Sequence, residues 1–290
     1  MNLSTPIAGC MRWGKWGSGF NTNDYYSMIQ ECLTNGITTF DHADIYGDYT
    51  TEHEFGKALE HNNALRDKIQ IITKCGIKMM TENRPHHTIK SYDTGRQHIM
   101  SSVDASLKNF NTDYIDVLLI HRPDPLLNPT EVAEAITQLK QQGKIISFGV
   151  SNFLPVQINA LHNFIKIEYN QFEVSLLNPV AFINGVLDNC LQHYIKPMAW
   201  APLGGGVLSD ESHPRYRTIS SAAMFLAEKY NTGINQVLIA FLLKHPSNII
   251  PVVGSTKMER LLQASNASGI ILTNEDWFTL YAASTGEEVA

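Results

Sequence analysis

Short apolar runs that alternate with amphipathic segments along the whole chain place the tightest limit on its fold. Strands that alternate with helices build βα units, which are typical of parallel sheets. The runs are nearly continuous in apolar residues, as expected for strands covered on both faces. We predict eight strands, at residues 6–11, 37–40, 69–73, 115–120, 146–150, 167–169, 197–200 and 249–253.

The segments between these runs carry helical signals. The apolar spacing predicts helices at residues 23–35, around 99–107, from 130 to 142, at 236–244 and at 257–267. Gly36 and Gly143 follow two of these segments, and glycine commonly ends a helix. Thr130 is expected to cap the third helix. Because no internal repeat or linker-like stretch interrupts the pattern, we predict one domain over residues 1–290.

Eight strands that alternate with helices can close into a barrel or form an open, doubly wound sheet. The open sheet of a dinucleotide-binding domain carries G-x-G-x-x-G after its first strand. Gly14 and Gly17 follow the first predicted strand, but they lack that spacing. The sequence therefore favours a (β/α)₈ TIM barrel of the α/β class.

Composition excludes several kinds of partner. With 43% hydrophobic residues, the 290-residue chain can form a substantial core. Its net charge of -6 provides no positive field for nucleic acid or an anionic membrane, so we expect neither as a partner. The four scattered cysteines argue against a zinc or disulfide framework. The first residues lack the basic and then apolar order of a signal peptide, and no run of 18 apolar residues suggests a membrane span. We therefore expect a cytoplasmic protein.

Polar side chains follow the apolar runs where the strands end. Asp41, Lys74 and His121 come directly after three successive runs. Taken alone, each has an ordinary explanation as a helix cap, a solvated loop residue or a turn residue. In a parallel barrel, however, the carboxyl ends of the strands form one mouth, where catalytic residues gather. We therefore expect the three side chains to point into one site.

These residue types suggest acid catalysis by a phenol. A lysine withdrawn from water keeps its proton only beside an anion, and Asp41 can hold Lys74 charged. The ammonium is then expected to lower the pKa of a neighbouring phenol toward a useful range, with Tyr46 as the candidate and Tyr49 as its rival. His121 would donate a hydrogen bond to a carbonyl oxygen.

Several segments resemble the aldo-keto reductase superfamily. Residues 40–47 with Glu52 and 55–59 are similar to its first signature, and residues 143–153 are closely similar to its second. Residues 72–74 and 113–121 are similar to the strands that bear its lysine and its histidine. The resemblance extends from about residue 5 to residue 267. Residues 121–125 and 203–206 make the bacterial oxidoreductase branch the nearest.

The resemblance implies an NADPH-dependent reductase of small-molecule aldehydes and ketones, with NADH a less favoured cofactor and no metal. The catalytic residues would be Asp41, Tyr46, Lys74 and His121. Residues implied to hold the nicotinamide are Ser151, Asn152, Gln171 and Trp200. The pyrophosphate loop would contain Leu203, Gly204 and Gly206, and the adenosine end with its 2′-phosphate would meet Ser255, Lys257, Arg260 and Gln263.

Three features depart from or add to the family pattern. His42 replaces the small residue usual after the aspartate, so we expect a more polar or more crowded mouth. Gly254 stands where many members carry a basic residue, and Lys257 is expected to substitute for it. Residues 79–96 are predicted to form an extended loop beside the mouth. His86 and His87 in that loop are interpreted as surface histidines rather than metal ligands.

Two other functions are consistent with such a barrel. A lyase could use Lys74 as a Schiff-base nucleophile, but this requires a neutral amine. A nicotinamide-binding regulatory or sensor subunit would show little turnover. In each case the partner is a small molecule, and we expect a monomer or a weak homo-oligomer.

Overall fold

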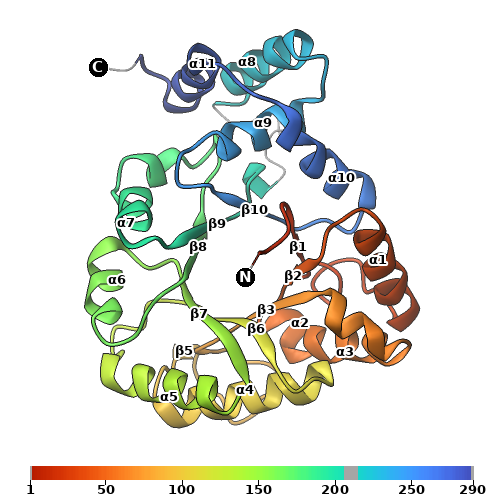
Figure 1. Ribbon diagram of the computed structural model, residues 1–290, viewed down its shortest axis with the longest axis vertical. Coiled ribbons are helices and arrows are strands. Elements are labelled where there is room, and N and C mark those ends of the chain that lie inside the picture. Colours follow the sequence, from red (N-terminus) through yellow and green to blue (C-terminus); the bar gives the residue numbers. More distant parts are fainter. Residues whose placement is uncertain (1, 206–214, 289–290) are drawn as a thin grey trace.

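The eight predicted strands close into a parallel barrel in the computed structural model, which describes residues 2–205 and 215–288 (Figure 1). Neighbouring strands follow the order β1-β10-β9-β8-β7-β6-β3-β2, and every pair in the barrel is parallel. The predicted (β/α)₈ fold is thereby confirmed. The barrel strands are β1 (Ile7–Gly9), β2 (Thr39–Asp41), β3 (Gln70–Cys75), β6 (Ile115–Ile120), β7 (Ile145–Ser151), β8 (Tyr169–Glu173), β9 (Lys196–Trp200) and β10 (Ile250–Val253).

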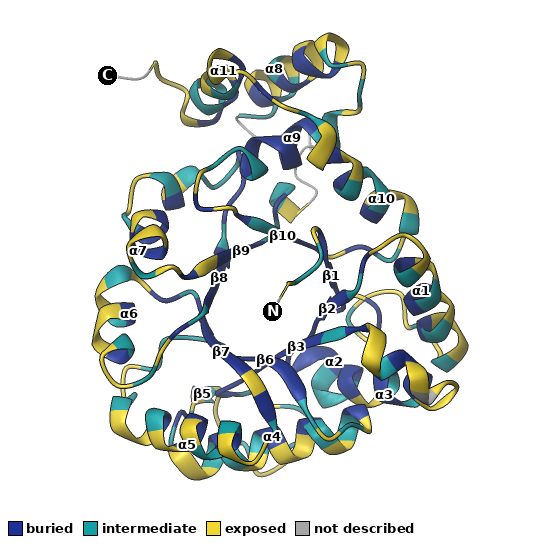
Figure 2. Cartoon of the chain, in the orientation of Figure 1, coloured by how far each residue is buried: buried dark blue, intermediate teal, exposed yellow. Residues whose placement is uncertain are grey.

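Helices surround the barrel and turn their exposed faces outward (Figure 2). The helices are α1 (Thr22–Thr34), α2 (Tyr46–Tyr49), α3 (Thr51–Glu60), α4 (Arg96–Phe110), α5 (Pro129–Gln141), α6 (Pro155–His162), α7 (Val186–His193), α8 (Tyr216–Lys229), α9 (Ile234–Leu243), α10 (Met258–Asn266) and α11 (Asn274–Thr285). Short 3₁₀ turns occupy Asn63–Lys68, Pro179–Phe182 and Ala267–Gly269. Each helix predicted from the sequence is present, with ends shifted by a few residues. Helices α8 and α11 pack together outside α9 (Figure 1). Within the described residues, no helix is long and apolar enough to cross a membrane.

Three predicted details differ from the structure. Thr130 does not cap α5: Asn128 is the N-cap, its side chain accepts a hydrogen bond from the Thr130 amide at 3.1 Å, and Pro129 begins the helix. The sixth strand was predicted at residues 167–169 but spans Tyr169–Glu173, because polar side chains at its end interrupt the apolar run. The predicted loop 79–96 contains β5 (Ser91–Tyr92), which pairs antiparallel with β4 (Ile77–Lys78).

Side-chain alternation along the strands separates two regions of core. One buried cluster fills the barrel interior and consists of Ile7, Ile72, Val117, Leu119, Tyr169, Met198 and Val252. Their neighbours in sequence, such as Ile71, Leu118 and Ile120, belong to the layers between barrel and helices. Gly149 allows this packing, since a Cβ there would lie 2.5 Å from the Tyr169 carbonyl oxygen. The middle of the barrel interior is thus apolar, and polar side chains follow at the carboxyl ends of the strands.

Candidate active site

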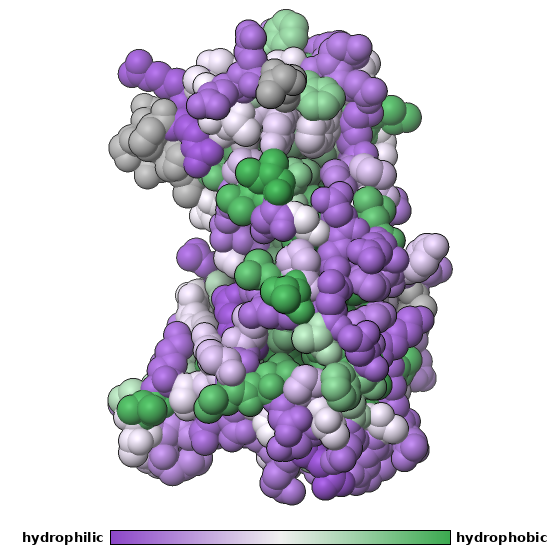
Figure 3. All heavy atoms as spheres, turned by 90° about the vertical axis from the view of Figure 1, so that its left-hand side faces the viewer, coloured by the Kyte–Doolittle hydropathy of each residue, from purple (hydrophilic) through white to green (hydrophobic). Residues whose placement is uncertain are grey.

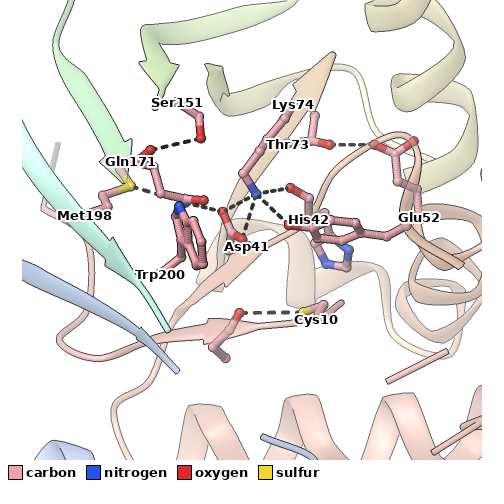
Figure 4. A network of polar contacts seen from close by, with 12 residues as sticks. Cys10, Asp41, His42, Glu52, Thr73, Lys74, Ser151, Gln171, Met198 and Trp200 are labelled. Atoms are coloured by element: carbon pink, nitrogen blue, oxygen red, sulfur yellow. Dashed lines mark hydrogen bonds and ion pairs between the residues drawn. The ribbon is translucent and has the colours of Figure 1, made fainter. Parts of the chain in front are cut away.

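Strand alternation also brings the predicted site residues into the barrel mouth. A residue two positions beyond an inward-facing one points inward again. Lys74 follows Ile72 in this way, His121 follows Leu119, Gln171 follows Tyr169, and Trp200 follows Met198. Asp41 ends β2, and its register partner is Ile72 on β3. Residues at the ends of five strands therefore converge on one site, which is drawn in part in Figure 4.

The ammonium of Lys74 is the centre of a buried polar network (Figure 4). The Lys74 side chain is 1% exposed, and its Nζ donates to the Asp41 carboxylate at 2.8 and 2.9 Å and to the His42 carbonyl at 2.7 Å. It also donates to the Tyr46 hydroxyl at 3.2 Å. Burial works against the charged form, but Asp41 and Tyr46 outweigh it and raise the pKa of Lys74. The lysine is held as a cation.

Tyr46 meets Lys74 from the loop after β2, where it begins the short helix α2. Because Lys74 is the donor to the Tyr46 oxygen, the phenol's own proton is left to donate elsewhere. Burial raises the pKa of Tyr46, and Lys74 opposes that rise without reversing it. The expected net lowering of this pKa was therefore wrong. Burial destabilises the phenolate form of Tyr46 more than the Lys74 ammonium stabilises it.

His121 is a neutral imidazole at the mouth. It is 7% exposed, and its ring centroid lies 6.1 Å from that of Tyr46. Burial lowers the pKa of His121 well below its usual value, and Lys74 and Arg122 add to the effect. A neutral imidazole donates from one ring nitrogen only. It can therefore polarise a carbonyl oxygen without competing with Tyr46 as the acid.

His42 does not shape the mouth, contrary to the sequence-based expectation. It follows the inward-facing Asp41, so its ring points outward and is fully buried against Phe55 and Phe110, at centroid distances of 4.5 and 5.1 Å. Neither ring nitrogen has a hydrogen-bond partner among the described residues. Burial, followed by Lys74, lowers the pKa of His42 well below its usual value. Only the backbone carbonyl of His42 reaches the site, through Lys74.

The residues predicted to hold the nicotinamide form a connected chain of polar groups. The Trp200 indole donates to Asn152 Oδ1 at 3.0 Å, Asn152 donates to Ser151 Oγ at 2.7 Å, and Ser151 donates to the Gln171 carbonyl at 2.9 Å. The Gln171 amide donates to the Asp41 carboxylate at 2.7 Å, a link that was not predicted (Figure 4). Asn152 adopts a left-handed φ of 62° where the chain leaves β7. The structure thus brings all four predicted residues together.

A second group of predicted residues lies where β10 passes into α10. The Ser255 hydroxyl accepts from the Lys257 amide at 3.0 Å and thereby shapes the turn before the helix. Lys257 is the N-cap of α10, and both Lys257 and Arg260 are exposed. Gln263 instead accepts from Asn235 of α9 at 3.1 Å. This helix start presents two cations with its free amides, which suits a phosphate.

The loop after β9 is described only up to residue 205. Leu203 packs against the core, and Gly204 has a left-handed φ of 64° with its amide bonded to the Ala201 carbonyl at 2.8 Å. A Cβ at Gly204 would lie 2.2 Å from Leu177, so a larger residue would not fit there without a shift. Gly206, which was predicted to belong to the pyrophosphate loop, lies outside the described residues.

Two further aromatic residues lie near Tyr46, and one of them, Trp16, was not assigned from the sequence. The Trp16 ring lies 6.0 Å from that of Tyr46, and its indole donates to Asp48 at 3.0 Å. The Tyr49 hydroxyl accepts from the Met79 amide at 2.9 Å, which ties the 79–96 loop to α2. Tyr49, the rival phenol, is thereby engaged away from Lys74. The only sequence signal for Trp16 was an aromatic residue in a glycine-rich segment after β1.

The other candidates for chemistry show ordinary structural roles. Cys75 is buried, and burial raises its pKa well above the usual value, so it packs as a small residue. His87 lies within 3.0 Å of the Met79 carbonyl through Nδ1, and its ring is 4.5 Å from that of His86. In the described part of the chain, no group of three or more histidine, cysteine or acidic residues is arranged to hold a metal.

The chain is similar to known oxidoreductases in sequence and in fold. The model of the aldo/keto reductase family matches residues 7–284. The chain is 41% identical to the uncharacterized oxidoreductase YcsN of Bacillus subtilis, over 100% of this chain and 97% of that protein. It is 40% identical to a 6-dehydroglucose reductase of Agrobacterium fabrum, over 96% of this chain and 95% of that protein. A crystal structure of a thermostable aldo-keto reductase with the inhibitor epalrestat superposes with a TM-score of 0.80 at 24% identity, covering 97% of this chain and 95% of that one.

Proposed function

The chain belongs to the aldo/keto reductase family, and from this premise we propose that it reduces aldehyde or ketone groups of small molecules to alcohols with NADPH. The observation that carries the proposal is the contact between Lys74 and Tyr46. A buried ammonium, held by Asp41, donates to the phenol at 3.2 Å. This arrangement leaves one acidic proton directed away from the lysine, as a carbonyl reductase requires.

The residues at the mouth have different roles in the proposed reduction. His121 donates a hydrogen bond to the substrate oxygen and orients it beside Tyr46. When bound, the nicotinamide supplies hydride to the carbonyl carbon. The oxygen then takes the proton of Tyr46, and Lys74 stabilises the phenolate that is left. An alkoxide is a far stronger base than a phenolate, so Tyr46 can serve as the acid although burial raises its pKa.

The side chains at the mouth fit a nicotinamide dinucleotide. Ser151, Asn152 and Gln171 offer hydroxyl and amide groups suited to a carboxamide, and the Trp200 ring beside them offers a stacking surface. In the described residues, nothing lies within 4 Å of a Cβ built on Gly254, so a ligand can approach the backbone there. The exposed Lys257 and Arg260 would meet a 2′-phosphate and favour NADPH over NADH.

The two alternative functions have less support. A Schiff-base lyase needs a neutral lysine, whereas Asp41 and Tyr46 raise the pKa of Lys74 against the effect of burial. A sensor subunit needs no aligned acid, yet Tyr46 lies within hydrogen-bond distance of Lys74. We propose a monomer or a weak homo-oligomer as the working state. On the face seen in Figure 3, apolar residues form small groups separated by hydrophilic ones, which supports that proposal.

A matched pair of tyrosine variants tests the proposal. NADPH oxidation is followed with a panel of aldehydes and ketones, including a hexose aldehyde because a relative is named a 6-dehydroglucose reductase. Tyr46→Phe is expected to lower kcat by about 10²–10⁴, since only the proton donor is lost. Tyr49→Phe is the control, because its hydroxyl bonds Met79 rather than Lys74. Equal activity of the two variants would contradict the assignment of the acid.

A further inference from the structure

The side chain of Arg122 extends across the barrel mouth. Arg122 directly follows His121 at the end of β6, yet its guanidinium carbon lies 6.0 Å from the ring centroid of Trp200 at the end of β9. Strands β7 and β8 separate β6 from β9 in the barrel. The guanidinium therefore lies over the opening, between the catalytic histidine and the indole.

The guanidinium of Arg122 has unused hydrogen-bond donors. Within residues 2–205 and 215–288, Arg122 makes no hydrogen bond and no ion pair, although its side chain is partly buried. Arg66 shows the contrast: it donates to Asp116 at 2.6 Å and to the carbonyls of Ile69 and Tyr114. A guanidinium offers five N–H donors in a planar fork. These donors are therefore available to a ligand that supplies acceptors.

Two carboxylates of the neighbouring loops are already engaged. Asp48 forms an ion pair with Lys15 at 2.6 Å, and Asp124 accepts from Thr94 at 2.8 Å and from the Leu126 amide at 2.8 Å. After burial, the charges that lower the pKa of His121 are those of Lys74, Arg122 and Lys90. Asp41 pairs with Lys74, and Arg122 is a further cation beside His121 that can attract an anion.

We infer that Arg122 selects carbonyl substrates that carry an oxyanion group, such as a carboxylate, and that its guanidinium binds this group while His121 and Tyr46 meet the carbonyl. The inference rests on the proposed reductase function and names its substrate class. A carboxylate matches the guanidinium fork with two parallel hydrogen bonds. Held in this way, the substrate presents its carbonyl to the acid at a fixed distance.

Paired acids and esters test the inference separately from the reductase function. The substrates are succinic semialdehyde and 4-carboxybenzaldehyde, each with its neutral methyl ester, assayed by NADPH oxidation. The wild type is expected to favour each acid over its ester about ten- to a hundredfold in kcat/KM. Added salt should reduce the preference. If only the esters are turned over, the proposed function is supported and the inference is overturned. If no carbonyl in the wider panel is turned over, the proposed function itself is contradicted.

Variants of Arg122 test whether this residue causes the preference for acids over esters. Arg122→Leu is expected to bring the acid-to-ester ratio close to one, and Arg122→Lys to retain part of it. Arg84→Leu is the matched control. The Arg84 guanidinium carbon lies 4.3 Å from the ring centroid of Tyr49, whereas Arg122 lies over Trp200. An equal fall of the ratio with Arg84→Leu would overturn the assignment to Arg122. A weaker affinity for NADPH with an unchanged ratio in Arg122→Leu would also overturn it.

Discussion

Lys74 and Tyr46 are joined by one hydrogen bond, and Asp41 holds Lys74 while its own charge also contributes to the raised pKa of Tyr46. Lys74 is the favourable influence that opposes the rise in the pKa of Tyr46 caused by burial. Removal of the ammonium should therefore weaken the acid nearly as much as removal of the phenol. Loss of the Asp41 carboxylate should be milder, because the His42 carbonyl still holds the lysine at 2.7 Å.

We predict that Lys74→Met lowers kcat about as much as Tyr46→Phe, within the range of about 10²–10⁴ for general acid catalysis. Asp41→Asn should lose less. The double variant Tyr46→Phe/Lys74→Met should be far less damaging than the product of the two single effects, because the residues form one unit. Steady-state kinetics measure these values, and nucleotide binding checks that the site is intact. Multiplicative losses would mean that the two residues act independently.

The site was largely predictable at the level of single residues, but their surroundings were not. Asp41, Lys74 and His121 follow apolar runs, so the strand pattern places them at the mouth. The same alternation could have placed the His42 ring outside the barrel, since it follows an inward-facing residue. The rise in the pKa of Tyr46 depends on how much water the folded loops exclude, and no local pattern in the sequence contains that quantity.

The junction of β10 with α10 is the part of the barrel that we expect to distinguish NADPH from NADH. Lys257 stands at the N-cap of α10, and Arg260 lies in its first turn. The free amides of a helix start favour an anion, and a guanidinium can add two charge-assisted hydrogen bonds. Both side chains are exposed, so a bound phosphate can reach them.

We predict that Arg260→Ala weakens NADPH binding about ten- to a hundredfold and leaves NADH binding nearly unchanged. Lys257→Ala should have a smaller and more salt-sensitive effect, because its ammonium is a point charge on a flexible stem. Quenching of tryptophan fluorescence by each nucleotide provides the affinities, with Trp200 as the expected reporter. If the wild type binds both nucleotides equally, the NADPH assignment fails while the reductase function stands.

The elements themselves were predictable where they are long and periodic. All eight barrel strands and the predicted helices were found, because burial on both strand faces and on one helix face leaves a pattern in the sequence. The β4–β5 pair was missed, since two-residue strands are too short to show a period. Strand β8 was placed too early because Asn170 and Gln171 serve the mouth and its surroundings rather than an apolar core.

The buried histidines link the stability of the fold to pH. In the folded chain the pKa values of His42 and His121 lie well below 6.5, chiefly because of burial. The unfolded chain binds protons at these positions as the pH falls through about 6.5, whereas the folded chain does not. The unfolded state then binds more protons, so acidification lowers the free energy of unfolding.

We predict that His42→Leu flattens the acid side of the stability profile. Between pH 7 and pH 5, each such histidine lowers the free energy of unfolding by up to about 2 kcal/mol. The variant should not show the part of this decrease that is due to His42. Burial raises the pKa of Glu52 and of Asp44, which acts in the opposite direction at lower pH, but the difference between wild type and variant cancels their contribution. Urea unfolding at several pH values measures the slope. His53→Leu is the control, because His53 is exposed on α3. An identical pH slope in wild type and His42→Leu would show that His42 is protonated in the folded protein as readily as in the unfolded chain.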